Sequence, residues 1–355
     1  MSHLRSEVLS MVGYSLPETL CSHDQRVKLD TNENPYECST SVRHAIEAVV
    51  QTGLGRYPDP TASEFRRTAA AVLGVEPDWI LCGNGSDDVL SICIRGFTRS
   101  GDTLHLTSPS YSFYDTLASI YNLQVDKVLF RPDWSLPDQY AKPSPDARLA
   151  VLANPNNPSG TVLTPDVIAK IASQLPCPLL IDEAYAEIAG VSCLELVAEN
   201  MNILVSRSMS KSYSLAGIRF GYLIAQPQVI EQLNKVKEPY NCDALSIAAA
   251  TAAIADQDWL TRCCSQIRET RERVRPQIEK LGFSVANSQA NFLWCCHSQL
   301  SASLVCEQLK QRQVIVRHLV YPHCEGLRVA IGTDGEMDFL LEQLRDIVSC
   351  VDSDD

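Results

Sequence analysis

From residue 60 onward the chain alternates short apolar runs with segments that carry the spacing of amphipathic helices. Short apolar strands that are separated by helices form mostly parallel sheets with both faces covered. The pattern therefore predicts an α/β fold on a mostly parallel central sheet. Strands are expected at Trp79–Cys82, Thr103–Thr107, Leu123–Phe130, Arg148–Ala153, Leu179–Asp182 and Ile203–Ser206, and helices at Glu64–Leu73, Ser86–Phe97, Pro165–Gln174 and Leu194–Glu199.

Past Pro239 the pattern changes to longer helices with a few strands, which is typical of a smaller α+β domain. With 355 residues the chain exceeds one ordinary domain. We expect a large domain at 41–240, linking helices and a small domain at 241–355, and an N-terminal segment, 1–40, that packs with the small domain and has little sheet structure. Helices are expected at Ala244–Ala255, Asp258–Leu281, Ser301–Lys310 and Met337–Val351, and strands at Phe283–Ala286, Asn291–Cys295, Val314–Val316 and Leu327–Ile331.

Composition restricts the partners of the chain. Its 30 Lys and Arg against 43 Asp and Glu give a net charge of -13, so neither nucleic acid nor an anionic membrane is an expected partner. An anionic ligand would need a few arginines focused at its site. The 14 cysteines are scattered, mostly in apolar runs, which is typical of buried thiols in a reducing cytoplasm. We expect no secretory or membrane-spanning segment and, without zinc-ligand spacing, no metal site.

A lysine follows one of the predicted buried strands. Lys211 stands among Ser208, Ser210 and Ser212, and Arg219 follows further along the chain, where we expect it to lie on a new strand. A lysine among small hydroxyl residues at a strand end can have a lowered pKa and act as an amine nucleophile. The hydroxyls and the guanidinium would suit a phosphate group. The alternative is a surface lysine in a serine-rich loop.

Three further polar segments also follow predicted strands. Asp182 ends one strand and Tyr185 comes soon after it, at the edge where open α/β sheets bind ligands. This carboxylate can pair with a protonated ring nitrogen, or it can simply cap the strand. The turn Asn154–Gly160 offers amide donors, and the turn Gly83–Asp88 leads into a helix whose free N–H groups can bind an anion. An ordinary turn and an ordinary helix cap are the alternatives for these two segments.

Together the four segments supply what a pyridoxal phosphate enzyme needs: a Schiff-base lysine, a carboxylate for the pyridinium nitrogen, donors for the ring hydroxyl, and a phosphate site. Over nearly its whole length the chain resembles the fold-type I pyridoxal phosphate aminotransferases, and more narrowly the histidinol-phosphate aminotransferase family. The motifs that carry the resemblance, in the family's order and spacing, are Asp30–Pro35, Arg56–Pro60, Gly83–Ser86, Pro109–Tyr114, Asn156–Gly160, Asp182–Tyr185, Ser210–Lys211, Leu215–Arg219 and Leu327–Gly332.

This resemblance implies a role for each cofactor-binding residue. Lys211 is expected to form the Schiff base with pyridoxal 5'-phosphate and to act as general base and acid. Asp182 is expected to pair with the pyridinium nitrogen, Asn157 and Tyr185 to bond the ring hydroxyl, and Tyr111 to stack on the ring. The expected catalytic residues are thus Lys211, Asp182 and Tyr185. The phosphate is expected to be held by Ser86 and Asp87, through the N–H groups of the helix start, together with Ser208, Ser210 and Arg219.

The resemblance also implies a homodimer with shared active sites, in which Tyr57 reaches the phosphate of the neighbouring subunit. Tyr14 resembles the N-terminal tyrosine that closes over the substrate. Arg328 matches the arginine that binds substrate carboxylates, and Arg317 matches one that helps to hold a substrate phosphate. Two arginines suit a phosphate monoester and also a dicarboxylate, and Arg317 could instead be a solvated arginine at a strand end.

The implied reaction is ping-pong transamination between L-histidinol phosphate and 2-oxoglutarate, which gives imidazole acetol phosphate and L-glutamate in histidine biosynthesis. An aromatic amino acid aminotransferase and a threonine-phosphate decarboxylase are the enzymatic alternatives, and the segment Asn32–Pro35 favours the transaminase. A non-catalytic pyridoxal phosphate sensor is the alternative from another class. No basic helix-turn-helix pattern precedes residue 40, and Lys211 and Asp182 are intact, which disfavours the sensor.

Overall fold

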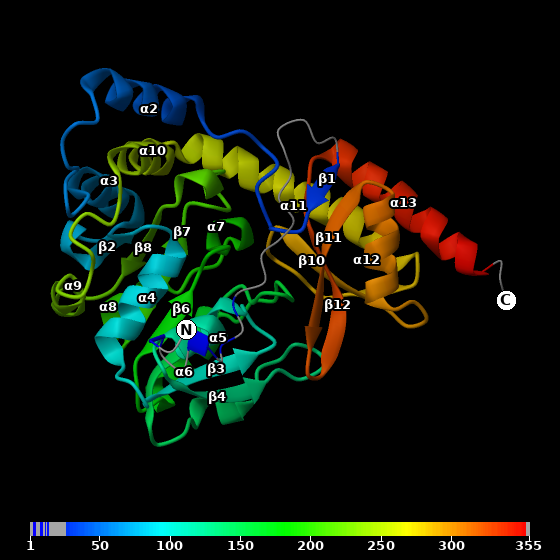
Figure 1. Cartoon of the computed structure of the whole chain (residues 1–355), viewed down its shortest axis with the longest axis horizontal. Helices are drawn as coiled ribbons and strands as arrows, with labels where there is room; N and C mark the ends of the chain where they lie inside the picture. The colour runs from blue at the N-terminus through cyan, green and yellow to red at the C-terminus, as the bar shows by residue number, and fades with distance from the viewer. Residues whose placement is uncertain (1–2, 5–7, 10, 12, 14–25, 353–355) are drawn as a thin grey trace.

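The computed structural model describes residues 3–4, 8–9, 11, 13 and 26–352, and this part of the chain is built around two sheets (Figure 1). The larger sheet has seven strands. Their order across the sheet is β2 (Ile80–Gly83), β8 (Gly221–Ile224), β7 (Ile203–Ser208), β6 (Leu179–Asp182), β5 (Ala147–Ala153), β3 (Thr103–Ser108) and β4 (Gln124–Leu129).

The large sheet is parallel apart from one strand, so the predicted α/β fold with a mostly parallel sheet is confirmed. β8 runs antiparallel to both of its neighbours, β2 and β7. The start of β8 therefore lies at the same edge as the ends of the other strands. Arg219 precedes β8 in a left-handed conformation with φ of 55°, so the prediction that places it on a strand is wrong. The antiparallel direction of β8 brings Arg219 to the carboxyl edge.

Helices cover both faces of the large sheet, because successive residues of each strand point to opposite sides. In β5, Leu149 and Val151 face one layer, whereas Ala150 and Leu152 face the other. The first layer contains α4 (Ser86–Phe97), α5 (Phe113–Ile120) and α9 (Pro227–Leu233). The second contains α6 (Pro165–Gln174), α7 (Ala186–Ala189) and α8 (Leu194–Glu199). Burial on both faces explains why these strands are almost continuously apolar.

The smaller sheet gathers strands from both ends of the chain. Its order is β1 (Val27–Leu29), β11 (Val314–Tyr321), β12 (Cys324–Ala330), β10 (Phe292–His297) and β9 (Phe283–Val285). β1 pairs in parallel with β11, and the other pairs are antiparallel. α12 (Ala302–Gln311) packs on β11 and on α13 (Asp334–Asp352). β1 is too short to show a strand period in the sequence. The predicted domain bounds, 1–40, 41–240 and 241–355, stay a prediction.

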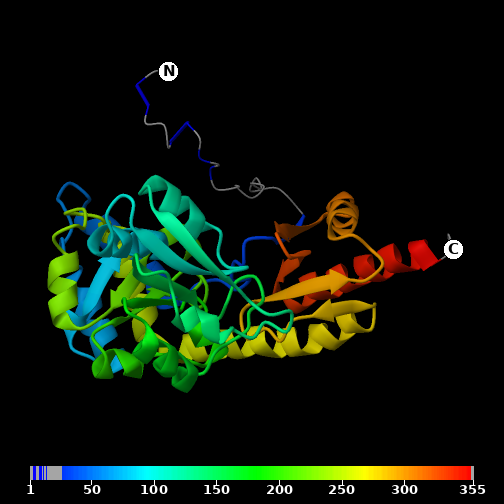
Figure 2. The same cartoon turned by 90° about the horizontal axis from the view of Figure 1, so that it is seen from below.

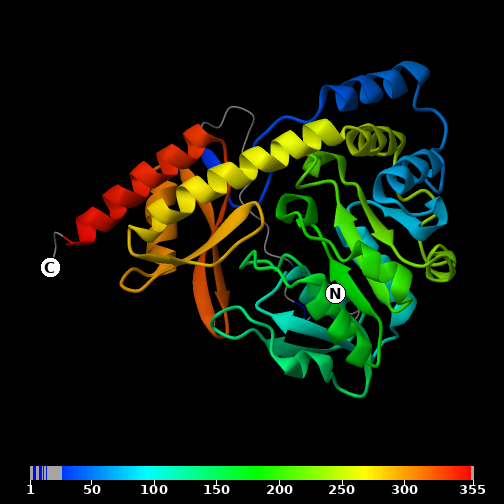
Figure 3. The same cartoon turned by 180° about the vertical axis from the view of Figure 1, so that it is seen from behind.

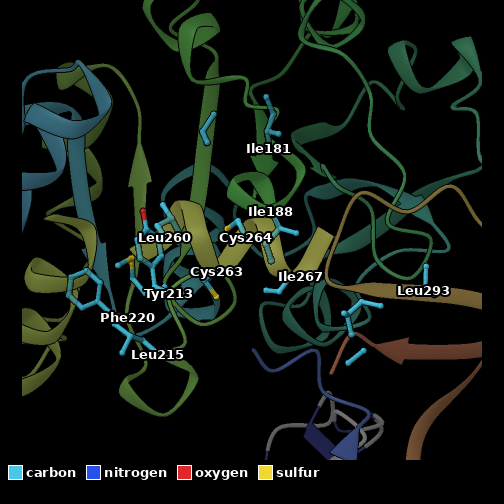
Figure 4. Packing of buried hydrophobic residues seen from close by; sticks show 14 of the residues in the cluster. Ile181, Ile188, Tyr213, Leu215, Phe220, Leu260, Cys263, Cys264, Ile267 and Leu293 are labelled. Carbon is cyan, nitrogen blue, oxygen red and sulfur yellow. The ribbon is translucent and has the colours of Figure 1, made fainter. Parts of the chain in front are cut away.

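The long helix α11 (Gln257–Glu279) connects the part of the molecule around the large sheet with the part around the small sheet. α10 (Ala244–Ala255) packs on α2 (Thr40–Thr52) and α3 (Ser63–Leu73), and α11 continues from it toward the small sheet (Figures 2 and 3). Figure 4 shows Leu260, Cys264 and Ile267 of α11 among buried side chains from the large sheet and the segments around it. Further along, α11 contacts α13 and β9. The sequence predictions did not include α2, whose one described buried residue is Val42.

Short 3₁₀ helices within the described residues lie at Pro77–Trp79, Asp138–Ala141 and Ala216–Ile218. None of the helices in this part of the chain combines the length and the apolar character that a bilayer crossing requires. Nor do His, Cys, Asp or Glu side chains gather in threes around a possible metal position among the described residues.

Candidate active site

A cavity of about 240 Å³ lies at the carboxyl edge of the large sheet, where open α/β sheets bind ligands. The strands β5, β6 and β7 end at its wall with Ala153, Asp182 and Ser208. The small sheet contributes Arg317 and Arg328, and the segment after β1 contributes residues 30–33. The site therefore needs both sheets and a segment from the beginning of the chain.

Lys211 lies in this cavity just after β7. Its Nζ donates a hydrogen bond of 3.0 Å to the carbonyl oxygen of Thr31. Burial, together with the positive charge of Arg328, lowers the pKa of Lys211 to about 8, although Glu33 and Asp87 oppose the shift. An amine with such a pKa carries far more of the nucleophilic neutral form at neutral pH than an exposed lysine does.

Asp182 ends β6 with its carboxylate buried in the cavity wall. The hydroxyl of Tyr114 donates to its Oδ2 at 2.7 Å, and the hydroxyl of Ser206 donates to its Oδ1 at 3.2 Å. Burial raises the pKa of Asp182 to about 6. The negative charge of Asp87 adds to this rise, whereas the hydrogen bond from Tyr114 lowers the pKa. The Tyr111 hydroxyl donates to Asp87 at 3.3 Å beside it. A buried carboxylate held by hydroxyl groups is suited to pair with a cationic ring nitrogen.

Separate hydrogen bonds connect the large sheet, the segment after β1 and the small sheet at the cavity. Asn32 Nδ2 donates to the hydroxyl oxygen of Tyr185 at 3.0 Å. Arg328 Nη1 donates to Asn157 Oδ1 at 3.0 Å, and its Nη2 donates to the carbonyl oxygen of Asp30 at 2.6 Å. These contacts fix Arg328 and place the Asn157 amide and the Tyr185 hydroxyl at the same cavity.

An anion site is formed where α4 begins. The helix starts at Ser86 without a side-chain cap, and the Arg219 guanidinium approaches the same point, with Nη1 donating to Ser210 Oγ at 3.4 Å. Gly85 has a φ of 83°, and a Cβ on it would lie 2.6 Å from Arg219 Nη2. A Cβ on Gly221 would collide with the backbone nitrogen of Ser86. The two glycines thus keep open a cradle whose donors suit a phosphate group.

The two candidate substrate arginines face each other across neighbouring strands. Arg317 of β11 and Arg328 of β12 are directly opposite in the antiparallel register, so their side chains emerge on one face. Both line the cavity. Like charges in opposite positions destabilise a sheet, and an anion between the two side chains offsets that cost.

Comparison with known proteins identifies the family. A model of aminotransferase class I and II matches residues 24–344. The chain belongs to this aminotransferase family. It is 46% identical over 314 residues to histidinol-phosphate aminotransferase of Rhodopirellula baltica, covering 88% of this chain and 87% of that protein. Over 354 residues it is 39% identical to the Geotalea uraniireducens protein of the same name, covering 98% and 100%.

Solved aminotransferase structures share the fold. Histidinol-phosphate aminotransferase from Sinorhizobium meliloti, solved with pyridoxal-5'-phosphate, superposes with a TM-score of 0.88 at 24% identity, covering 99% of both chains. L-threonine-O-3-phosphate decarboxylase from Porphyromonas gingivalis gives 0.79 at 19% identity, covering 91% of this chain and 99% of that one. The fold-type I architecture expected from the sequence is therefore confirmed.

The aminotransferase cavity brings together nearly all the residues singled out in the sequence. Tyr57 is 80% exposed and stacks on Tyr240 at 4.5 Å between ring centroids, away from the described cavity lining. Tyr14 lies outside the described residues. The predicted residues that line the cavity are Ser86, Asp87, Tyr111, Asn157, Asp182, Tyr185, Ser208, Ser210, Lys211, Arg219, Arg317 and Arg328.

Sequence reasoning missed several polar groups of this site. Tyr114 was quoted only as part of a motif, yet it hydrogen-bonds Asp182. Thr31, Asn32 and Glu33, which were likewise quoted only within the motif Asp30–Pro35 and given no role of their own, also line the cavity. The signal for these three was the polar run before Pro35, which has no helix or strand period and leads into a helix. Asn32 bonds Tyr185 and the Thr31 carbonyl oxygen accepts from Lys211, and the sequence does not identify these partners because they lie far along the chain. The Glu33 carboxylate instead accepts from the nearby side chains of Thr31 and Lys28.

Proposed function

We propose that this aminotransferase, with pyridoxal 5'-phosphate as cofactor, exchanges an amino group between L-histidinol phosphate and 2-oxoglutarate. The products are imidazole acetol phosphate and L-glutamate, in a step of histidine biosynthesis. The observation that carries the proposal is the pairing of Arg317 with Arg328 on the face that lines the cavity of Lys211. The relatives named histidinol-phosphate aminotransferase, up to 46% identical, support the choice of substrate.

The residues present fit the cofactor at each of its groups. Asp182 would accept a hydrogen bond from the ring nitrogen and keep a proton on it, which suits a buried carboxylate with hydroxyl donors. Asn157 and Tyr185 would bond the ring hydroxyl, and Tyr111 would lie against the ring. The phosphate would be bound by the N–H groups of Ser86 and Asp87 at the start of α4 together with Ser208, Ser210 and Arg219, all of which line the cavity.

Lys211 is the proposed catalytic acid and base. When bound, pyridoxal 5'-phosphate supplies a ring that accepts the electrons released as the substrate carbon loses its proton. Lys211 would hold the cofactor through its amine until the substrate amine takes that place. Its Nζ would then remove the proton from the substrate carbon that carries the amino group, a role favoured by its lowered pKa of about 8.

The two arginines would divide the recognition of substrate, with Arg328 serving both half-reactions. Arg328 is held by Asn157 and the Asp30 carbonyl and would bind the carboxylate of glutamate and 2-oxoglutarate. Arg317 would add a second positive charge for the phosphate of histidinol phosphate. In a chain with a net charge of -13, this local pair would attract an anionic substrate against the net charge.

The assembly and its location complete the proposal. We propose a homodimer in which Tyr57, exposed in the single chain, serves the cavity of the neighbouring subunit. Tyr14 would close over the substrate. A cytoplasmic location is supported by the described cysteines, which are free and mostly buried thiols. The proposed division into residues 1–40, 41–240 and 241–355 is supported by the two separate sheets.

An amino-donor panel tests the function directly. Purified enzyme with cofactor is assayed with histidinol phosphate, phenylalanine, tyrosine, glutamate and threonine phosphate. Preference for histidinol phosphate in kcat/KM is expected. A preference for phenylalanine or tyrosine would favour an aromatic aminotransferase, and release of carbon dioxide from threonine phosphate would favour a decarboxylase. Binding of the cofactor without turnover of any donor would favour a sensor.

A further inference from the structure

A buried ion cluster lies close to the active-site edge. Arg207 is next to Ser208 in β7, so its side chain points to the opposite face of the sheet from Ser208, which lines the cavity. Arg207 Nε donates to Glu183 Oε2 at 2.8 Å, and its Nη1 donates to Glu187 Oε1 at 2.5 Å. Its Nη2 donates to the Ser192 hydroxyl oxygen at 2.7 Å. The side chains of Arg207 and Glu183 are 6% and 0% exposed. Buried charges are tolerated only when they are paired and hydrogen-bonded, so this cluster holds a single geometry.

The cluster reaches the residue next to the catalytic lysine. The Ser212 hydroxyl donates to Glu187 Oε2 at 2.8 Å, and Ser212 is fully buried. In addition, Asn34 Nδ2 donates to the carbonyl oxygen of Lys211 at 2.8 Å and to that of Ser212 at 3.4 Å. The segment that carries the lysine is therefore held both through its backbone carbonyl groups and through the Ser212 side chain.

We propose that Glu187 and Ser212 are positioning residues that fix the backbone at Lys211, so that its amine is correctly placed for proton transfer. Neither side chain is part of the described cavity lining, so both act through Lys211 rather than on the substrate. A lysine already has a long flexible stem, so any movement of its backbone would add to the range of positions that its amine can take. The proposal rests on the proposed function in so far as Lys211 moves the proton.

The first test compares two serine deletions in the same loop of the full-length holoenzyme. Ser212→Ala removes the hydroxyl that bonds Glu187. Ser214→Ala is the matched control, because the buried hydroxyl of Ser214 has no hydrogen-bond partner among the described residues. For Ser212→Ala we expect kcat per bound cofactor to fall about 10- to 100-fold, the range for a slightly misplaced catalytic group. KM for donor and acceptor should stay within about twofold, because both arginines are untouched.

A spectroscopic measurement separates positioning from a general loss of activity. The pH titration of the absorbance of the bound cofactor reports the environment of the Lys211 amine without turnover. Ser212→Ala should shift this titration, whereas Ser214→Ala should leave it and kcat unchanged. Wild-type rates in Ser212→Ala, or equal losses in both serine variants, would overturn the proposal.

Glu187→Gln provides a second variant that keeps the cluster paired. The glutamine oxygen can accept from Arg207 while its amide donates to the Ser212 hydroxyl, which can also accept. We therefore expect kcat within about threefold of wild type, because the positioning contacts remain. A loss as large as that of Ser212→Ala would show that the charge of Glu187 matters rather than the contact, and would overturn the proposal.

Failure of the positioning proposal can be told apart from failure of the proposed function. Every variant is compared with wild type on whichever donor the wild-type enzyme uses best. If wild type prefers another donor over histidinol phosphate, the proposed substrate is wrong, while the ratio of Ser212→Ala to Ser214→Ala still decides the role of the cluster.

Discussion

Replacing Arg317 by glutamine tests whether the pair of arginines selects the substrate phosphate. Arg317 and Arg328 are opposite each other in the β11–β12 register and line the cavity together. A hydrogen bond to a charged group contributes about 1.5–3 kcal/mol, which corresponds to roughly a 10- to 150-fold loss of kcat/KM when it is removed. The same change leaves the contacts of Arg328 with Asn157 and the Asp30 carbonyl in place, so binding of a substrate that uses only Arg328 should be little affected.

The assay compares two amino donors with 2-oxoglutarate as acceptor. We expect Arg317→Gln to lose roughly 10- to 150-fold in kcat/KM with histidinol phosphate and little with phenylalanine, which has a carboxylate but no phosphate. His318→Gln is the matched control. It is the next residue of β11, it points to the other face of the strand, and its Nε2 lies 2.9 Å from Glu325 Oε1. This control should leave both donors unaffected.

Two results would refute the reasoning about Arg317. An equal loss with both donors would mean that Arg317 supports the sheet or binds carboxylates in general. No loss with either donor would mean that its side chain does not touch the substrate. In both cases the aromatic aminotransferase would become the better proposal.

Three further predictions address the cofactor site and the assembly. Borohydride reduction of the holoenzyme followed by peptide mapping should label Lys211, and Lys211→Ala should bind cofactor without turnover; a label on another lysine would refute the assignment. Mixing Lys211→Ala with Tyr57→Phe subunits should give hybrids with one intact shared site, more active than the average of the two parent dimers. Because burial raises the pKa of Asp182 from 3.8 to about 6, the folded state binds more protons between these values, and stability falls as pH rises through that range. Urea unfolding of cofactor-free Asp182→Asn should therefore show a stability gain over wild type that grows from pH 4 to pH 7, to at most about 3 kcal/mol.

Local structure was largely readable from the sequence. The bounds predicted for Pro165–Gln174, Leu179–Asp182 and Ala244–Ala255 agree with the structure. Each is a segment whose apolar pattern or proline start depends only on its own residues. The polar residues at strand ends were also readable, because parallel strands separated by helices bring their carboxyl ends to one edge. Fold class and cofactor chemistry followed from these local features and from the family resemblance.

Tertiary structure decided how these groups meet. The antiparallel insertion of β8 brings Arg219 to the helix start at Ser86, and the pairing of β11 with β12 sets Arg317 opposite Arg328. The hydrogen bonds from Tyr114 to Asp182 and from Asn34 to Lys211 join residues that are distant in the chain. Strand register and direction depend on packing between segments that are far apart in sequence, and no single segment carries that information. The sequence by itself determined which chemical groups are available, and only the folded chain determined their partners, their burial and therefore their pKa values.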